Sequence, residues 1–96
     1  MLVIRETFTA KPGQASKLAK LFLKVFGEDK TARVMTDLVG DYNTVVIERQ
    51  VKNLEEYEKQ MEEYSSGKMD PDIAKEMAHY TEMYMKGRRE IFKIVE

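Results

Sequence analysis

Glu6 and Arg49 are charged residues within otherwise apolar alternating runs, and they are the strongest candidates for chemistry in this sequence. Such alternation predicts half-buried strands. A carboxylate and a guanidinium on one buried face lose hydration, so such a pair is often retained for function. The alternative is an ordinary ion pair near a partly wet sheet end. In the functional interpretation, Arg49 orients an oxyanion or carboxylate and Glu6 positions Arg49.

His79 is the third candidate catalytic residue and the only histidine in the chain. Its imidazole has an unperturbed pKa near neutrality, so it is suited to shuttle a proton. The apolar stripe of the surrounding helix points Tyr80 inward, however, and this leaves His79 roughly a hundred degrees away. A rim or surface position is the simpler interpretation. One histidine among scattered carboxylates does not indicate a metal site, and we predict none.

Methionine and tyrosine side chains are concentrated in the second half of the chain. Together they can line an adaptable pocket for an apolar or aromatic ligand. At helical spacing the same residues can instead fill an ordinary core. The candidate ligand-binding residues are Thr36, Tyr57, Met61, Met77 and Tyr80.

The composition indicates one globular domain spanning residues 1–96, with 43% hydrophobic and 34% charged residues. Sixteen basic and seventeen acidic residues leave a net charge of -1, which argues against a nucleic-acid-binding protein. The chain has no cysteine, which excludes disulfides and thiolate chemistry and suits the cytoplasm. No apolar run is long enough for a membrane span, and the first strand leaves no room for a signal peptide.

The expected elements alternate between strands and helices. Strands are predicted over 2–9, 32–39, 44–51 and 89–95, with a hairpin turn at 40–43. Pro12 opens a first amphipathic helix and Gly27 ends it. Asn53 and Glu56 form a capping-box-like start for a second helix, which 65–67 ends. Asp70-Pro71 opens a third, which runs to Gly87 with Ile73, Met77, Tyr80 and Tyr84 on its apolar face.

This order predicts an α+β fold of the ferredoxin-like type, a βαββααβ sandwich with helices on one face of a four-stranded antiparallel sheet. Right-handed crossovers place the first and third strands in the centre. Opposite charges meet when Arg5 pairs with Glu48, whereas pairing Arg5 with Arg49 would oppose like charges. The core face then carries Leu2, Ile4, Glu6, Phe8, Val34, Thr36, Leu38, Val45, Ile47, Arg49, Val51, Phe92 and Ile94.

The other face of the sheet is expected to stay uncovered within one chain. It mixes charged residues such as Arg5 and Glu48 with apolar ones such as Val3 and Val46. It is too apolar to be left in water and too charged for a dry core. We therefore expect a homodimer that packs sheet against sheet through this open face, with an unusually apolar solvated face as the alternative.

The strand that leads into Lys11-Pro12-Gly13-Gln14, the amphipathic helix after it, and the hairpin around Asp41-Tyr42 resemble the dimeric α+β barrel superfamily. The nearest branches are the antibiotic-biosynthesis-monooxygenase-like and NIPSNAP-like small domains, and the resemblance covers essentially the whole chain. It implies two ferredoxin-like protomers packed sheet to sheet, with a ligand cleft between each sheet and its helices. Haem degradation, one of the superfamily's activities, is not expected because the chain has no tryptophan.

The resemblance implies a cofactor-independent, monooxygenase-like enzyme acting on a small apolar or aromatic substrate. The alternative is a non-catalytic module that binds a small ligand, or a structural dimer with a filled core. Replacing Arg49 by Met separates these hypotheses. If Arg49 serves a ligand, binding is lost while the fold persists. If it is only structural, a little stability is lost and nothing else.

Overall fold

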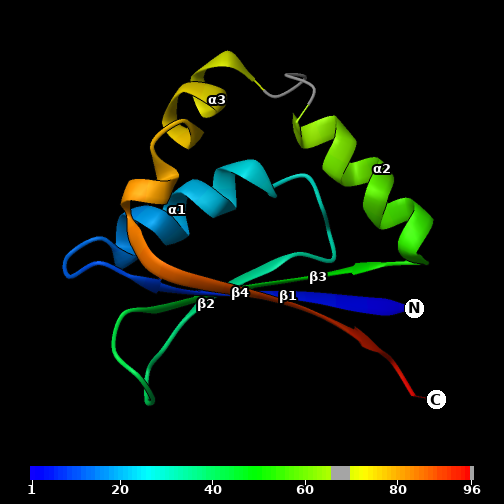
Figure 1. Cartoon of the computed structure of the whole chain (residues 1–96), viewed down its shortest axis with the longest axis horizontal. Helices are drawn as coiled ribbons and strands as arrows, with labels where there is room; N and C mark the ends of the chain where they lie inside the picture. Colours follow the sequence, from blue (N-terminus) through cyan, green and yellow to red (C-terminus); the bar gives the residue numbers. More distant parts are fainter. Residues whose placement is uncertain (66–69, 96) are drawn as a thin grey trace.

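The computed structural model describes residues 1–65 and 70–95 and shows one sheet with helices above it (Figure 1). The elements are β1 (Leu2–Ala10), α1 (Ala15–Val25), β2 (Arg33–Thr36), β3 (Thr44–Val51), α2 (Leu54–Ser65), α3 (Pro71–Met77), the 3-10 helix η1 (Tyr80–Glu82) and β4 (Tyr84–Lys93). The strand order is β2-β3-β1-β4, with every neighbouring pair antiparallel. The predicted ferredoxin-like order and the central position of β1 and β3 are confirmed.

The predicted register of the two central strands is also confirmed. Arg5 lies opposite Glu48, so Glu6 and Arg49 come to share the face below the helices. Along β1 and β3 the residues of this face are almost fully buried, and Ile4, Val45 and Ile47 are at most 1% exposed. The two strands therefore hold the Glu6–Arg49 pair against a closely packed apolar core.

Three helices cover this face and none of the described ones lies on the other (Figure 1). α1 packs Leu18, Leu21 and Phe22 on the sheet. The predicted starts of the second and third helices are confirmed, because the Asn53 side chain accepts from Glu56 N–H at 2.9 Å and Asp70 caps α3. The first helix differs from the prediction, since Pro12 lies in a turn and α1 begins at Ala15 after the N-cap Gln14. Of the predicted end of the second helix, Ser66 and Gly67 lie outside the described residues.

The second strand is shorter than the predicted 32–39. It ends at Thr36, and the chain turns through residues with positive φ at Gly40 and Asn43 before β3 begins. Thr36 pairs with Val45 and so lies on the core side of β2, as predicted, but it is exposed, and Leu38, which lies beyond the strand, is 97% exposed and outside the core. The Asp37 carboxylate accepts from Thr44 N–H at 2.9 Å, and this local bond closes the hairpin in place of the three further strand residues that were predicted.

The third helix and the last strand also differ from the prediction. α3 ends at Met77, and β4 begins at Tyr84 rather than at residue 89. The cause is long-range pairing, because β4 runs antiparallel to β1 over its whole length and the Tyr84 ring packs 4.8 Å from Phe8. Gly87 therefore does not end a helix but lies opposite Phe8 within the sheet.

The earlier start of β4 changes which of its residues face the helices. Arg89 pairs with Glu6, and Ile91 pairs with Ile4, so these residues share the core face. The prediction that Phe92 and Ile94 enter the core was wrong. Phe92 pairs with Val3 and lies on the open face, where the Arg5 guanidinium is 5.2 Å from its ring centroid.

Candidate functional site

A cavity of about 230 Å³ lies between the sheet and the helices. Every strand but β2 contributes to its walls, as do all three α-helices and η1. The lining residues are Glu6, Phe8, Phe22, Val25, Phe26, Ile47, Arg49, Met61, Tyr64, Met77, Tyr80 and Arg89. Most are apolar or aromatic, and the few polar groups converge from β1, β3 and β4, which is the usual construction of a small-molecule site.

The centre of the cavity is a carboxylate held between two guanidinium groups. One Glu6 oxygen accepts from Arg49 Nη1 at 2.9 Å, and the other accepts from Arg89 Nη2 at 3.4 Å. The Arg49 side chain is 1% exposed and that of Glu6 is 12% exposed, whereas Arg89 is 48% exposed. The cleft therefore holds one fully buried cation, one nearly buried anion and one cation at its edge.

Aromatic rings fix the position of the buried arginine. The Arg49 guanidinium carbon lies 5.0 Å from the centroid of the Phe26 ring and 5.9 Å from that of Tyr57. Arg49 Nη2 is 3.9 Å from the Met61 sulfur, and Nε has no hydrogen-bond partner among the described residues. Cation–π contacts thus hold the group in place while much of its hydrogen-bonding capacity is unused.

Tyr57 also supports the second arginine. Partial burial alone would lower the pKa of Arg89, but the charge of Glu6, together with hydrogen bonds to Glu6 and Tyr57, raises it above its ordinary value. Arg89 is therefore a permanent cation. Tyr57 lies beside both guanidinium groups without lining the cavity itself.

A row of aromatic side chains forms the far wall of the cleft. Phe22 packs 5.0 Å from Phe8 and 6.3 Å from Tyr80, and Phe26 packs 5.5 Å from Tyr64. Burial raises the pKa of Tyr64, and burial together with a neighbouring tyrosine raises that of Tyr80. Both phenols stay protonated at neutral pH, so they can donate hydrogen bonds to a ligand.

The structure brings five of the eight predicted site residues to this cavity, namely Glu6, Arg49, Met61, Met77 and Tyr80. Two other predicted residues lie elsewhere. Thr36 is at the exposed end of the edge strand β2. His79 precedes η1 with its side chain 70% exposed, and its Nδ1 is 3.3 Å from Glu82. Helical geometry already turned His79 away from the apolar stripe, and the early end of α3 keeps it at the surface.

Arg89 is a charged residue of the cleft that was not predicted from the sequence. The prediction started the last strand at residue 89 and assigned its faces one residue out of register. Matching opposite charges between the first and last strands would have predicted that Arg89 lies on the core face. The observed register sets Glu6 opposite Arg89 and Arg5 opposite Glu90, which joins opposite charges twice.

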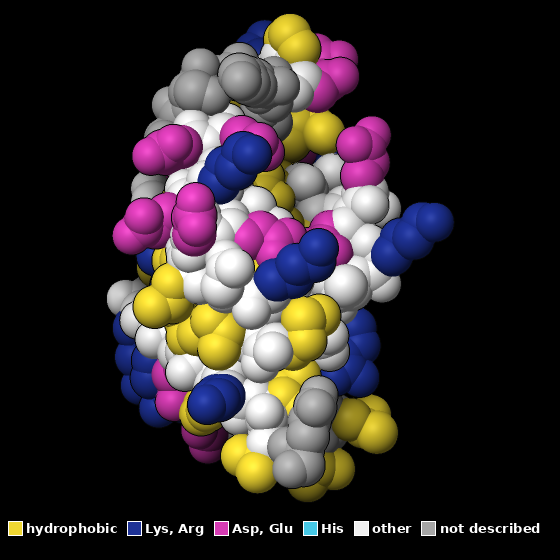
Figure 2. Space-filling view, turned by 90° about the vertical axis from the view of Figure 1, so that its right-hand side faces the viewer, with side chains coloured by type: hydrophobic (Ala, Val, Ile, Leu, Met, Phe, Trp, Pro, Cys, Tyr) yellow, Lys and Arg dark blue, Asp and Glu magenta, His cyan; other side chains and the backbone are white. Residues whose placement is uncertain are grey.

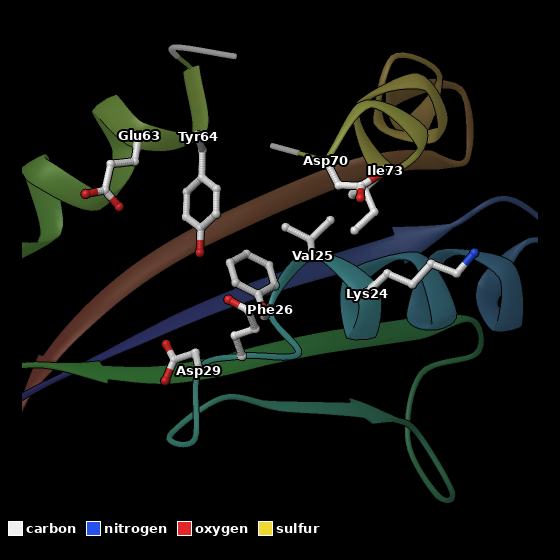
Figure 3. A pocket seen from close by; sticks show the side chains of 9 residues that line it. Lys24, Val25, Phe26, Asp29, Glu63, Tyr64, Asp70 and Ile73 are labelled. Atoms are coloured by element: carbon white, nitrogen blue, oxygen red, sulfur yellow. The ribbon is translucent and has the colours of Figure 1, made fainter. Parts of the chain in front are cut away.

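A second hollow lies beside the cleft, between the ends of α1 and α2 and the start of α3 (Figure 3). Glu63 and Tyr64 project from α2, Asp70 and Ile73 lie across from them, and Phe26 lies between. Phe26 and Tyr64 line both spaces, so their packed rings form the partition between hollow and cleft. The hollow is larger, about 440 Å³, but none of the described polar side chains that line it is buried.

A third, shallower hollow lies at the end of the sheet near both termini. Figure 2 shows apolar side chains gathered there, below the charged side chains of α2. Met1, Leu54 and Ile91 line it and are 52%, 58% and 38% exposed. The polar residues that line it, Lys52, Asn53, Glu55 and Lys93, are all exposed, so the Glu6–Arg49–Arg89 cleft, with its buried charges, is the candidate.

Solved structures with similar folds provide the comparison with known proteins. An uncharacterized NIPSNAP domain protein from Burkholderia xenovorans superposes with a TM-score of 0.72 at 16% identity, covering 99% of this chain and 95% of that one. A NIPSNAP family protein from Agrobacterium tumefaciens gives a TM-score of 0.81 at 9% identity, with coverages of 99% and 86%. A candidate antibiotic biosynthesis monooxygenase from Deinococcus radiodurans gives 0.66 at 13% identity, with coverages of 100% and 94%.

The chain has the fold of these proteins. The predicted resemblance to the dimeric α+β barrel superfamily is confirmed at the level of fold. No protein-family model matches the chain, and a comparison with curated protein sequences found no match. Within residues 1–65 and 70–95, no helix is long and apolar enough to cross a membrane. In the same residues, no group of three or more acidic or histidine side chains is arranged to hold a metal ion.

Proposed function

We propose that this protein binds a small apolar or aromatic molecule in the Glu6–Arg49 cleft and acts on it as a cofactor-independent, monooxygenase-like enzyme. One observation carries the proposal. A cavity walled by aromatic and methionine side chains contains an ion pair that is 1% and 12% exposed. Burying two charges costs more than burying apolar residues of the same size, so folding alone does not explain the pair. Binding a polar group of a ligand does.

The residues of the cleft suit an oxygenation that begins with loss of a substrate proton. Glu6 is the carboxylate lining the cleft and the proposed acceptor of that proton. Arg49 stabilises the resulting anion, and Tyr80 donates a hydrogen bond. The electron-rich anion itself reduces dioxygen, so no further reductant is needed. In the net reaction a CH2 group and O2 become a C=O group and water. The lack of cysteine in the sequence fits the proposed cytoplasmic location.

The second candidate is a non-catalytic module that binds the same class of ligand. The position of His79 favours it, because the only histidine of the sequence, the predicted proton shuttle, lies at the surface rather than in the cleft. The two functions share the binding site and differ only in whether dioxygen is consumed.

We also propose that two copies pair through the open face of the sheet. Val3, Val46 and Phe92 lie on this face, and no described helix covers it. Glu48 accepts from Arg5 and Arg33 there, at 2.9 and 3.0 Å. These three charges of the face are therefore already paired within one chain, which lowers the cost of removing water from them.

Oxygen uptake tests the enzymatic proposal. The protein is incubated with phenylacetaldehyde, whose single ring and three further heavy atoms match the size of the cleft and whose CH2 group is acidic and oxidisable, and dissolved oxygen is followed with an electrode. We expect uptake above the spontaneous rate for the wild type and only the spontaneous rate for Arg49→Met. Binding of the probe without oxygen uptake would overturn the enzymatic proposal and support the non-catalytic binding module. Absence of both binding and uptake would overturn both.

Light scattering tests the dimer separately. Wild-type protein is expected to elute with the mass of two chains, and Val46→Glu, which places a charge in the middle of the open face, with the mass of one. Gln50→Glu is the control, since Gln50 lies at the exposed end of the same strand and the same face. A wild-type monomer would contradict the proposal.

A further inference from the structure

The cleft holds more positive than negative charge. Among the described residues that line it, the charged ones are Glu6, Arg49 and Arg89, so two guanidinium groups face one carboxylate. Each Glu6 oxygen is already bonded to one of the arginines. The site is thus left with one net positive charge that Glu6 cannot neutralise.

The buried arginine also has donors to spare. A guanidinium carries five N–H donors, and only one contact from Arg49 to an oxygen atom, that of Glu6, is found among the described residues. Its Nη2 reaches a sulfur at 3.9 Å, and Nε has no partner there. A side chain that is 1% exposed cannot obtain the missing partners from bulk water. A bound anion at the edge of the cleft would supply both the charge and the acceptors that the pair of arginines lacks.

The size of the space limits what the anion carries. A cavity of about 150 Å³ is enough for a benzene ring, and a water molecule takes a share of about 30 Å³. The cleft has about 230 Å³, so a ring leaves room for a group of two or three heavy atoms. The ring of the ligand can pack against the aromatic side chains of Phe22, Phe26 and Tyr80, which line the cleft. A carboxylate fits the remaining room and accepts two hydrogen bonds from a guanidinium.

We infer that the ligand of this cleft is a small aromatic monoanion of the benzoate type, whose carboxylate is bound by Arg49 and Arg89 together. The inference rests on the proposed function and names the class of molecule that the same site takes. Arg89 is the residue that sets the preference for charge. Without it, Arg49 and Glu6 neutralise one another and the cleft should accept neutral ligands equally well.

Benzoate and benzamide form a matched pair of probes, since they share shape and size and differ in charge at neutral pH. Each is titrated into nitrogen-15-labelled protein, and the backbone signals and arginine Nε–H signals are followed by NMR. We expect benzoate to bind at least tenfold more tightly than benzamide, equivalent to about 1.4 kcal/mol. The shifts should centre on the cleft and include the Nε–H signal of Arg49.

Two variants assign the preference to Arg89. Arg89→Gln should reduce the preference for benzoate to less than threefold, and it should fold because the side chain is 48% exposed. Lys86→Gln removes the same charge from the same strand at an exposed position that does not line the cleft, and it should keep the wild-type preference.

The possible failures are distinguishable. If both probes bind in the cleft with equal affinity, the proposed ligand site stands and the anion inference is overturned. If the preference survives in Arg89→Gln, or benzoate shifts signals only outside the cleft, the inference is again overturned. If neither probe shifts a cleft signal, the proposed function and this inference fail together.

Discussion

Removing one member of the buried ion pair should destabilise the protein more than removing both. Glu6→Gln leaves Arg49, which is 1% exposed, without its carboxylate, and breaking such a pair costs about 3–5 kcal/mol. Arg49→Met should cost less, about 2–3 kcal/mol, because Glu6 keeps Arg89 at 3.4 Å and is slightly wetter. A domain of this length has a total stability of about 5–14 kcal/mol, so both losses are easy to measure.

The double variant Glu6→Leu with Arg49→Met replaces both charges by apolar side chains. Such replacements are neutral or stabilise by about 1–4 kcal/mol, so the double variant should be at least as stable as the wild type. Arg89 is half exposed and can turn toward water once its partner is removed. With the single losses given above, the interaction free energy of the cycle should therefore be at least about 5 kcal/mol.

Urea unfolding followed by circular dichroism measures all four proteins. One protein concentration is used throughout, because dissociation of a dimer makes apparent stability depend on concentration. Glu58→Gln, at an exposed position on α2, is the control and should change stability by less than about 0.5 kcal/mol. A Glu6→Gln variant as mild as this control, or single losses that simply add in the double variant, would show that the pair carries no such cost.

Two further predictions concern the rest of the sheet. Desolvation alone would raise the pKa of Glu48, but hydrogen bonds and charges from Arg33 and Arg5 lower it below 4.5. The folded pKa is thus the lower one, so this stabilisation is complete above pH 4.5 and disappears as the pH falls through the folded value. Glu48→Gln should cost about 1 kcal/mol at pH 7 and almost nothing in strong acid, as urea unfolding at each pH would show, and a loss independent of pH would disprove this. Gly87→Ala should cost about 1–3 kcal/mol in thermal and urea unfolding, because its Cβ would lie 3.0 Å from the buried Phe8 ring, and an unchanged midpoint would show that the ring moves freely.

The fold could be predicted because local and long-range signals agree along most of the chain. Alternating apolar residues located β1 and β3, and the charges of Arg5 and Glu48 selected their register. That register alone brings Glu6 and Arg49 together, 43 residues apart in sequence. The Glu6–Arg49 pair of the candidate site can thus be predicted from the sequence by matching opposite charges between neighbouring strands.

The rest depended on tertiary contacts that override local propensity. Residues 78–87 have a helical apolar stripe, yet pairing with β1 draws Tyr84 onto Phe8 and starts β4 inside the predicted helix. Because the predicted faces of the last strand were shifted by one residue, Arg89 was not assigned to the cleft, and the net charge of the cleft was not predicted. Leu38 was placed in the core by extending a strand that the Asp37–Thr44 contact ends early, whereas Thr36 does lie on the core side but at the exposed end of the edge strand.

Native mass spectrometry of the purified protein with added benzoate tests whether the space between the sheet and the helices is a ligand site in a dimeric barrel. We predict a mass of two chains that takes up one benzoate per chain. Arg49→Met should keep the mass of two chains and take up none. A wild-type dimer without added mass, or an Arg49→Met variant that binds benzoate as the wild type does, would contradict the account.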